Sequence, residues 1–443
     1  MADPQPLVRK IGLFTATSIV IANMVGAGIF TTTGLIAAGL PNPFWVLVFW
    51  MAGGLIALAG ALCYAELATR MPEDGGEYVY LSKLYHPSFG FLTGWTSFFV
   101  GFSAPIAASS LGFSEYILSG LDVTEVLHHW LTKILGLSII VIFTTLHYFG
   151  HTWGARIQNV LTGLKILIIL GLVVLGWVLM DPGKIQLFES AGTSIGGLAI
   201  GTSMMFVMFS YSGWNASGYI AGELKNPSRS LPISLVSGTL IVMMIYLAVN
   251  LFILRSLPFH EIRGTITIVE KASMAAFGQN IGRFFGVLSG IALLASLSAF
   301  ILLGPRIYFA MARDKAFFPF AAKVHPKYQV PGRSIVIQGV IAGILVLIGS
   351  FEQIVIYLEF ALLIFPPFAV AGLFIARQRK LGETTAVKTW GYPYIPIFFL
   401  LSSLLIMVVA FLNRPVESVA AIITILVGIP LYYLMVRKNS GKS

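Results

Sequence analysis

Long apolar stretches alternate with short polar ones along almost the whole chain. A helix needs about 20 apolar residues to cross a bilayer, and twelve stretches approach or exceed that length. They lie near 11–38, 43–70, 88–119, 134–150, 156–180, 192–222, 231–254, 281–311, 334–350, 353–376, 394–412 and 416–436. Runs of this kind predict an all-α bundle of twelve transmembrane helices and not a barrel of short alternating strands.

Composition and charge agree with a membrane protein. Of the 443 residues, 57% are hydrophobic and only 10% are charged, far below the charge of a soluble domain. With twelve crossings, both termini share a side, and that side carries 20 of the 28 Lys and Arg; seven lie opposite, and Lys165 lies within a span. This bias predicts cytoplasmic termini in the inner (plasma) membrane, and it explains the net charge of +10 without a nucleic-acid partner.

Two spans carry glycines in their middle, in VGAGIF (25–30) and in FSYSGWNASG (209–218). A glycine inside a helix costs about 1 kcal/mol relative to alanine and lets the backbone unwind. Unwound backbone is tolerated at membrane depth only where it is buried in protein or lines a cavity. The alternative for either stretch is close helix packing without unwinding.

The two interrupted spans, the first and the sixth, are five spans apart. Paired interruptions at matching positions of two related halves indicate the substrate site of a transporter. Free N–H groups at one helix end suit a carboxylate, and free carbonyls at the other suit an ammonium. An α-amino acid carries both groups.

Several longer motifs resemble the amino acid–polyamine–organocation transporter superfamily, and within it the L-type amino acid transporter group of bacterial type. They are VGAGIF (25–30), YAELATRMPEDGGEYVYL (64–81), FSYSGWN (209–215), GELKNPSRSLP (222–232), RIYFAMARDKAFFP (306–319), WGYPYIP (390–396) and RPVESVAAIITILVGIPLYY (414–433). The resemblance implies a leucine-transporter-type fold with a five-plus-five inverted repeat. The expected parts are a cytoplasmic tail (1–10), a first repeat (11–180), a second repeat (192–376), spans 11 and 12 (394–436) and a second cytoplasmic tail (437–443).

The resemblance also implies a binding site at mid-membrane, used by alternating access. The backbone of Gly26, Ala27 and Gly28 would hold the substrate carboxylate, although Ala27 replaces a frequent family serine and so removes a hydroxyl. The carbonyls of Met24 and Phe209 would receive the amino group, and Phe209 would close over the substrate. The full predicted set is Met24, Val25, Gly26, Ala27, Gly28, Phe209, Ser210, Ser212, Gly213 and Trp214, of which Trp214 could also serve packing alone.

Two further residues have roles implied by the resemblance. Lys165 would occupy the volume that sodium fills in sodium-coupled relatives, and an unpaired charge at this depth costs about 3 kcal/mol. The alternative is a lysine that snorkels to the inner headgroups. Tyr246 resembles a tyrosine that hydrogen-bonds near the unwound region and links it to span 5, with ordinary aromatic packing as the alternative.

The remaining ionisable residues suggest less chemistry. Glu66 is expected to form a salt bridge with the basic inner loops, and Glu359, deep in span 10, is a candidate proton site without a family counterpart. Cys63 is the single cysteine, expected as a small core residue. The seven histidines show no metal-ligand spacing, so neither a metal nor another cofactor is expected.

The sequence therefore predicts a secondary active transporter and not an enzyme: a sodium-independent exchanger of small neutral L-amino acids. Proton-coupled symport through Lys165 is the alternative, and a membrane enzyme or a channel is more distant, because paired catalytic groups and a repeated pore motif are both missing from the sequence. Animal L-type members bind a heavy chain through a cysteine after span 3. Residues 121–133 contain none, so no disulfide-linked partner is expected, only substrate and lipid.

Overall fold

The structure is a computed structural model, and it describes residue 9 and residues 11–149, 151–179, 197–313, 317–328, 330–384 and 386–440. The predicted tail 1–10 lies almost entirely outside these residues. Within the described part, the regular structure is helical, apart from one isolated parallel bridge between Ile11 and Leu224. The expected all-α architecture is confirmed.

Within the described residues, each predicted apolar stretch overlaps one helix or two or three successive helices. In chain order the elements are α1 (Leu13–Met24), α2 (Ala27–Ala38), α3 (Pro43–Arg70), α4 (Glu77–Leu84), α5 (Pro87–Thr96), the π-helix η1 (Ser97–Gly101), α6 (Ser103–Leu118), α7 (Glu125–Phe149), α8 (His151–Leu179), α9 (Gly197–Tyr211), the 3-10 helix η3 (Ala216–Glu223), α10 (Pro227–Ser256), α11 (Phe259–Ile262), α12 (Ile268–Phe277), α13 (Gln279–Arg313), the 3-10 helix η4 (Pro319–Ala322), α14 (Gly332–Ile348), α15 (Phe351–Gln378), α16 (Tyr394–Asn413) and α17 (Pro415–Ser440).

The helices have the length and composition of a multi-pass membrane protein. Among the described residues, nine helices are long and apolar enough to cross a bilayer, and the bent pair α1–α2 makes a tenth. The apolar helix α14 is shorter, with 17 residues, and α9 has 15. The total of twelve spans and the inverted repeat stay predictions.

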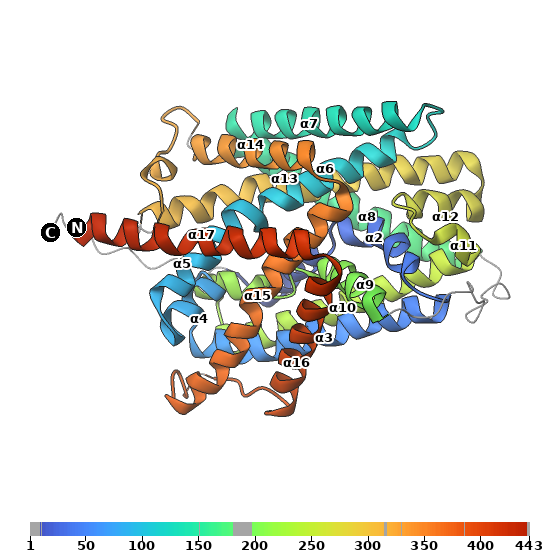
Figure 1. Cartoon of the computed structure of the whole chain (residues 1–443). Helices are drawn as coiled ribbons and strands as arrows, with labels where there is room; N and C mark the ends of the chain where they lie inside the picture. Colours follow the sequence, from blue (N-terminus) through green and yellow to red (C-terminus); the bar gives the residue numbers. More distant parts are fainter. Residues whose placement is uncertain are drawn as a thin grey trace.

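The long helices form a bundle around the two interrupted spans (Figure 1). Helices α7 and α14 lie side by side on one flank, and α3 and α10 lie together on the opposite flank. Helix α9 contacts both α2 and α3, so the interrupted spans meet inside the bundle. In a membrane the hydrophobic effect does not drive helices together, so their association depends on close van der Waals packing. Small residues allow that close approach.

Two loop regions cover the ends of the interrupted spans. On one face, the Gly264 N–H donates to the Gly34 carbonyl of α2 at 2.7 Å. On the other face, the Gly75 N–H, in the loop before α4, donates to the Tyr219 carbonyl of η3 at 3.1 Å. Each of these interrupted spans therefore has one half fastened to a connecting loop.

Candidate functional site

The first interruption lies between α1 and α2, which meet at a bend of 42°. Val25 and Gly26 both have extended backbone angles, and no side chain caps the start of α2. Because the helix is interrupted, the first N–H groups of α2 have no carbonyl one turn earlier to bind. The predicted break in the first span is present, and its α2 side offers donors to an anion.

The second interruption follows α9, which ends at Tyr211. Gly213 has a φ of +98°, a value that side-chain-bearing residues rarely adopt, and η3 begins at Ala216. A Cβ on Gly213 would lie 3.0 Å from the backbone carbon of Asn23 in α1. The two interruptions are therefore in direct contact, and only glycine fits where they touch.

Tyr246 of α10 joins the two interruptions. Its hydroxyl is buried and lies 2.7 Å from the Met24 carbonyl oxygen and 2.8 Å from the Ser210 carbonyl oxygen. The hydroxyl has one proton, so it donates to one carbonyl at a time. The expected hydrogen bond near the unwound region is present, but these bonds link spans 1 and 6 and not span 5.

Lys165 provides the link from α8. Its side chain is 3% exposed, and Nζ donates to the Val25 carbonyl at 2.5 Å and to the Ala22 carbonyl at 3.4 Å. Snorkelling to the headgroups is therefore not what this lysine does in the structure. The ammonium lies against the last carbonyls of α1, where a helix C-terminus favours a cation.

Part of the predicted binding set takes part in helix packing. A Cβ on Gly28 would lie 2.5 Å from the Ser210 Cα and 2.6 Å from its Cβ, so α2 and α9 cross at this point with no space between them. The Ser210 hydroxyl is 2.9 Å from that of Thr32 and 2.8 Å from the Phe206 carbonyl. Packing, the alternative reading of these glycines, therefore applies to Gly28, and the Ser210 hydroxyl is already bonded within the crossing.

Gly26 has different surroundings. It is partly exposed, and a Cβ built on it would meet the Ser296 hydroxyl oxygen of α13 at 3.7 Å, an ordinary contact distance. The Ser296 hydroxyl is buried and has no hydrogen-bond partner among the described residues. Sequence reasoning missed Ser296, because nothing in span 8 distinguishes it from the neighbouring serines Ser289 and Ser298.

Three other predicted residues belong to the second interruption. Phe209 and Ser212 are partly exposed, and the Ser212 N–H donates to the Phe209 carbonyl at 3.1 Å. The Trp214 ring is buried, with its centroid 4.7 Å from that of Tyr64 and 6.0 Å from that of Phe399. Packing therefore explains the Trp214 side chain, while the binding role of the whole set stays a prediction.

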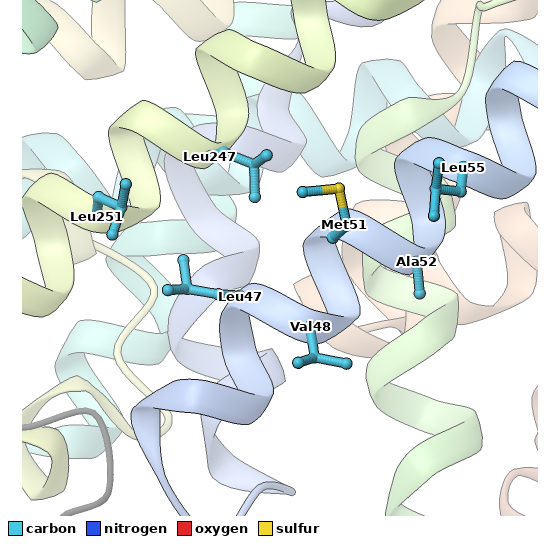
Figure 2. Close-up of a pocket in the computed structure, with 7 residues that line it drawn as sticks. All are labelled: Leu47, Val48, Met51, Ala52, Leu55, Leu247 and Leu251. Carbon is cyan, nitrogen blue, oxygen red and sulfur yellow. The ribbon is translucent and has the colours of Figure 1, made fainter.

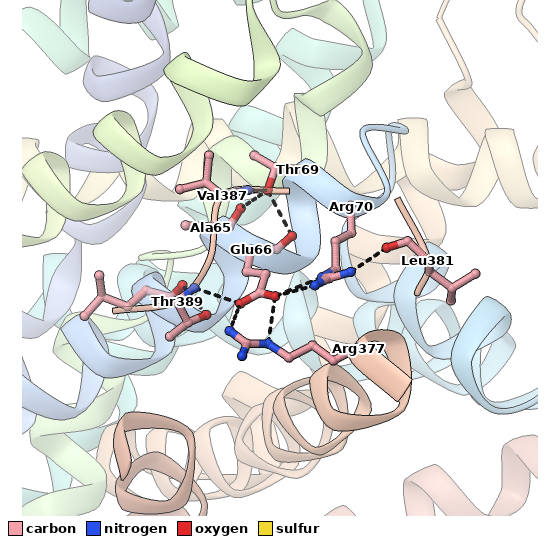
Figure 3. A network of polar contacts seen from close by, with 9 residues as sticks. Ala65, Glu66, Thr69, Arg70, Arg377, Leu381, Val387 and Thr389 are labelled. Carbon is pink, nitrogen blue, oxygen red and sulfur yellow. Dashed lines mark hydrogen bonds and ion pairs between the residues drawn. The ribbon is translucent and has the colours of Figure 1, made fainter. Parts of the chain in front are cut away.

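Glu66 forms the salt bridges that the sequence predicts (Figure 3). Its carboxylate pairs with Arg70 at 2.8 Å and with Arg377 of α15 at 2.6 Å, and it accepts the Thr389 N–H at 2.7 Å. The network fastens the end of α3 to α15 and to the chain before α16. A carboxylate with two arginines is stabilised in its ionised form, so the structural interpretation of Glu66 is confirmed.

Two further features concern α15 and the flank formed by α3 and α10. Glu359 is 4% exposed, and its Oε2 has no hydrogen-bond partner in the part of the chain that the structure describes. A groove of about 490 Å³ runs between α3 and α10 (Figure 2), and its lining residues are Leu47, Val48, Met51, Ala52, Leu55, Leu247 and Leu251. This lining is apolar, so the groove offers nothing to either charged end of an amino acid.

The comparison with known families agrees with this geometry. The family model described as amino acid permease matches residues 11–435. The chain belongs to this family. The resemblance to the amino acid–polyamine–organocation superfamily is thereby confirmed for nearly the full length of the permease.

Individual relatives cover the permease almost end to end. The serine/threonine exchanger SteT of Bacillus subtilis (strain 168) is 30% identical over 445 residues, spanning 98% of both chains. The b(0,+)-type amino acid transporter 1 of Mus musculus is 27% identical over 98% of this chain and 89% of its own. The Asc-type amino acid transporter 1 of Homo sapiens is 23% identical over 97% of this chain and 82% of its own.

Proposed function

We propose that this permease exchanges small neutral L-amino acids across the inner membrane, by alternating access and without sodium. The observation that carries the proposal is the pair of touching interruptions, joined by Tyr246, with Gly26 facing a Ser296 hydroxyl that has no hydrogen-bond partner among the described residues. The relatives are named as amino acid transporters or exchangers, which supports transport and not an enzymatic reaction.

The substrate would lie in the space in front of Gly26. Its carboxylate would accept N–H groups of the first turn of α2, and its ammonium would lie near the carbonyl of Phe209. We expect Ala27, Ser212 and Ser296 to border this space, and because they are small and uncharged they favour a small neutral side chain. The first relative named above is an exchanger of serine and threonine, which supports the same size and polarity.

The sodium independence rests on Lys165. Its ammonium binds the Ala22 and Val25 carbonyls, so a positive charge already stands where carbonyls at the end of α1 could coordinate a cation. The burial pattern supports a state open towards the start of α1, proposed as the cytoplasmic side. Asn23 is exposed and Gly26 partly exposed, whereas every residue from Ala27 to Gly34 is buried.

Proton-coupled symport is the second candidate, because among the described residues Lys165 has carbonyl partners and no carboxylate that would fix its charge. Counterflow in proteoliposomes separates the two functions. Exchange requires strong uptake into vesicles filled with L-serine and little uptake into empty vesicles under an acid-outside gradient. Accumulation into empty vesicles driven by that gradient would establish symport instead, and the absence of both would contradict amino acid transport.

A further inference from the structure

The loop before α4, residues 72–76, packs against η3, the helix that follows the second interruption. The Asp74 carboxylate accepts the Gly222 N–H at 2.9 Å, and the Gly75 N–H donates to the Tyr219 carbonyl. Gly76 has a φ of +52°, and a Cβ there would lie 2.8 Å from the Tyr219 ring. Loop and η3 therefore form one closely fitted unit.

Glu77 lies where this loop meets the interruption. It is the first residue of α4 and 8% exposed, and its Oε1 accepts the Tyr64 hydroxyl at 2.7 Å and the Asn215 Nδ2 at 2.8 Å. Tyr64 belongs to α3, and Asn215 is the last residue of the turn between α9 and η3. One carboxylate oxygen therefore connects α3, α4 and the interruption in span 6.

The Asn215 amide thus serves Glu77 and is not free for a ligand. Its backbone also starts the η3 turn, since the Gly218 N–H donates to the Asn215 carbonyl at 2.9 Å. Two residues earlier, Gly213 touches Asn23 beside the first interruption. A shift of Asn215 would therefore move the segment that borders the space in front of Gly26.

Unlike the other buried carboxylates at helix ends, Glu77 forms no ion pair with a cation in the described part of the chain. Glu66 has two arginines, and Glu270 of α12, 4% exposed, pairs with Arg283 at 2.7 Å. Hydrogen bonds from neutral donors hold a carboxylate less firmly than ion pairs do. The geometry of this cluster is therefore sensitive to whether Glu77 is ionised.

We infer that Glu77 is a positioning residue for substrate binding: through Asn215 it holds the unwound segment of span 6 in its binding geometry. The inference rests on the proposed amino acid transport. Glu77 does not touch the substrate space and acts only through the turn that it anchors.

The surroundings of Glu77 give the inference a pH signature. The pKa of Glu77 is raised above its usual value, because burial outweighs the opposing effect of the hydrogen bonds from Tyr64, Asn215 and Tyr219. Below that pKa the carboxyl is neutral, its bonds weaken, and substrate affinity should fall with the pH on the loop side. The nearest titratable groups are the hydroxyls of Tyr64 of α3, Tyr80 of α4 and Tyr219 of η3. The other titratable or charged groups on the surrounding described elements are Asp74 and the Glu73–Lys83 pair of the loop region, Glu223 at the end of η3, His86 before α5, Glu66 with Arg70 and Arg377, and Arg379 after α15, which donates to the Leu84 carbonyl.

The test compares Glu77→Gln with Glu73→Gln in proteoliposome counterflow of L-serine. Glu73 is on the same loop and pairs with Lys83 at the surface, so the control removes one charge without touching η3. We expect Glu77→Gln to raise KM about tenfold, with a smaller change in the maximal rate, and to remove the dependence of KM on loop-side pH. Glu73→Gln should keep the wild-type KM and pH profile.

Exchanging the carboxyl and amide groups of Glu77 and Asn215 tests whether these two side chains act as a pair. Asn215→Asp alone places two carboxyls against each other and should weaken binding, whereas Glu77→Gln together with Asn215→Asp exchanges donor and acceptor and should restore KM towards the wild-type value. Failure of the double variant to recover, with folded protein, would contradict the pairing. A Glu77→Gln protein with wild-type KM and pH profile would overturn the inference.

A measurement without transport separates this inference from the proposed function. In a Cys63→Ala, Ser212→Cys background, the rate of thiol labelling reports how firmly the turn is held. Glu77→Gln should speed the labelling and Glu73→Gln should not. If the wild type shows no amino acid counterflow, the proposed function fails, and equal labelling rates in both variants would still overturn the role of Glu77.

Discussion

The region around Gly26 and the region around Gly28 are two residues apart in the motif VGAGIF, yet their surroundings are opposite. At Gly26 a Cβ would find ordinary contact distances, the nearest being 3.7 Å to the Ser296 hydroxyl. At Gly28 it would lie 2.5 Å from the Ser210 Cα, inside the crossing of α2 and α9. A side chain at Gly26 would make only ordinary contacts, whereas Gly28 lets two helices touch.

This difference shows that a glycine motif in a transporter can combine two separate functions. Gly28 brings the two interrupted spans together, and that contact is required for folding whatever the substrate is. Gly26 can accept a small side chain without a clash, so a substitution there tests the proposed ligand space and not helix packing. Substitutions at the two positions should therefore fail in different ways.

The largest effect is expected for Gly28→Val. The added side chain overlaps Ser210 in a crossing where both backbones are fixed, so we expect a destabilisation of about 3 kcal/mol and a loss of detergent-stable protein. Thermal unfolding, monitored by size-exclusion chromatography of heated samples, measures the loss of stability. Gly163→Val is the matched control, because nothing lies within 4 Å of a Cβ at Gly163; equal stability of the two variants would contradict the packing role.

The next effect is expected for Gly26→Ala. The backbone angles of Gly26 are extended and the Cβ has room, so the variant should fold with wild-type thermal stability. The methyl group occupies the proposed ligand space, and affinity for L-serine should fall about tenfold. Ligand-induced thermal shift measures the affinity, and an unchanged shift would exclude Gly26 from the site.

A smaller effect is expected for Ser296→Ala. Affinity should fall about fivefold, because one hydrogen bond to the ligand is lost. Stability without ligand should not fall, since the hydroxyl has no partner to lose. Ser298→Ala is the control on the same helix: its hydroxyl lies 2.9 Å from the His147 Nε2, so that variant should lose stability and keep its affinity, and the reverse pattern would contradict the assignment.

Much of the fold could be predicted because a membrane helix is indicated by its own run of apolar residues, without knowledge of distant contacts. Long apolar runs predicted where the long helices lie, and the glycines in 25–30 and 209–218 predicted both interruptions, since a weak helix former inside an apolar run is a local signal. The buried Lys165 was equally visible, because a charge at this depth needs a reason.

The division of roles within the site could not be predicted, because it depends on distant partners. Gly28 meets Ser210 from 182 positions away in the chain, Gly26 faces Ser296, and Glu77 finds Asn215 across 138 positions. Each pairing is set by how the helices cross. No periodicity or motif in a single sequence distinguishes a glycine that packs from one that leaves room.

The most direct test of the account is an experimental structure of the permease with L-serine bound. We expect the carboxylate beside the first N–H groups of α2 and the rest of the amino acid between Gly26 and the Ser296 hydroxyl, with both spans still interrupted. An amino acid bound elsewhere, or a helix that runs without a break from Leu13 to Ala38, would contradict it.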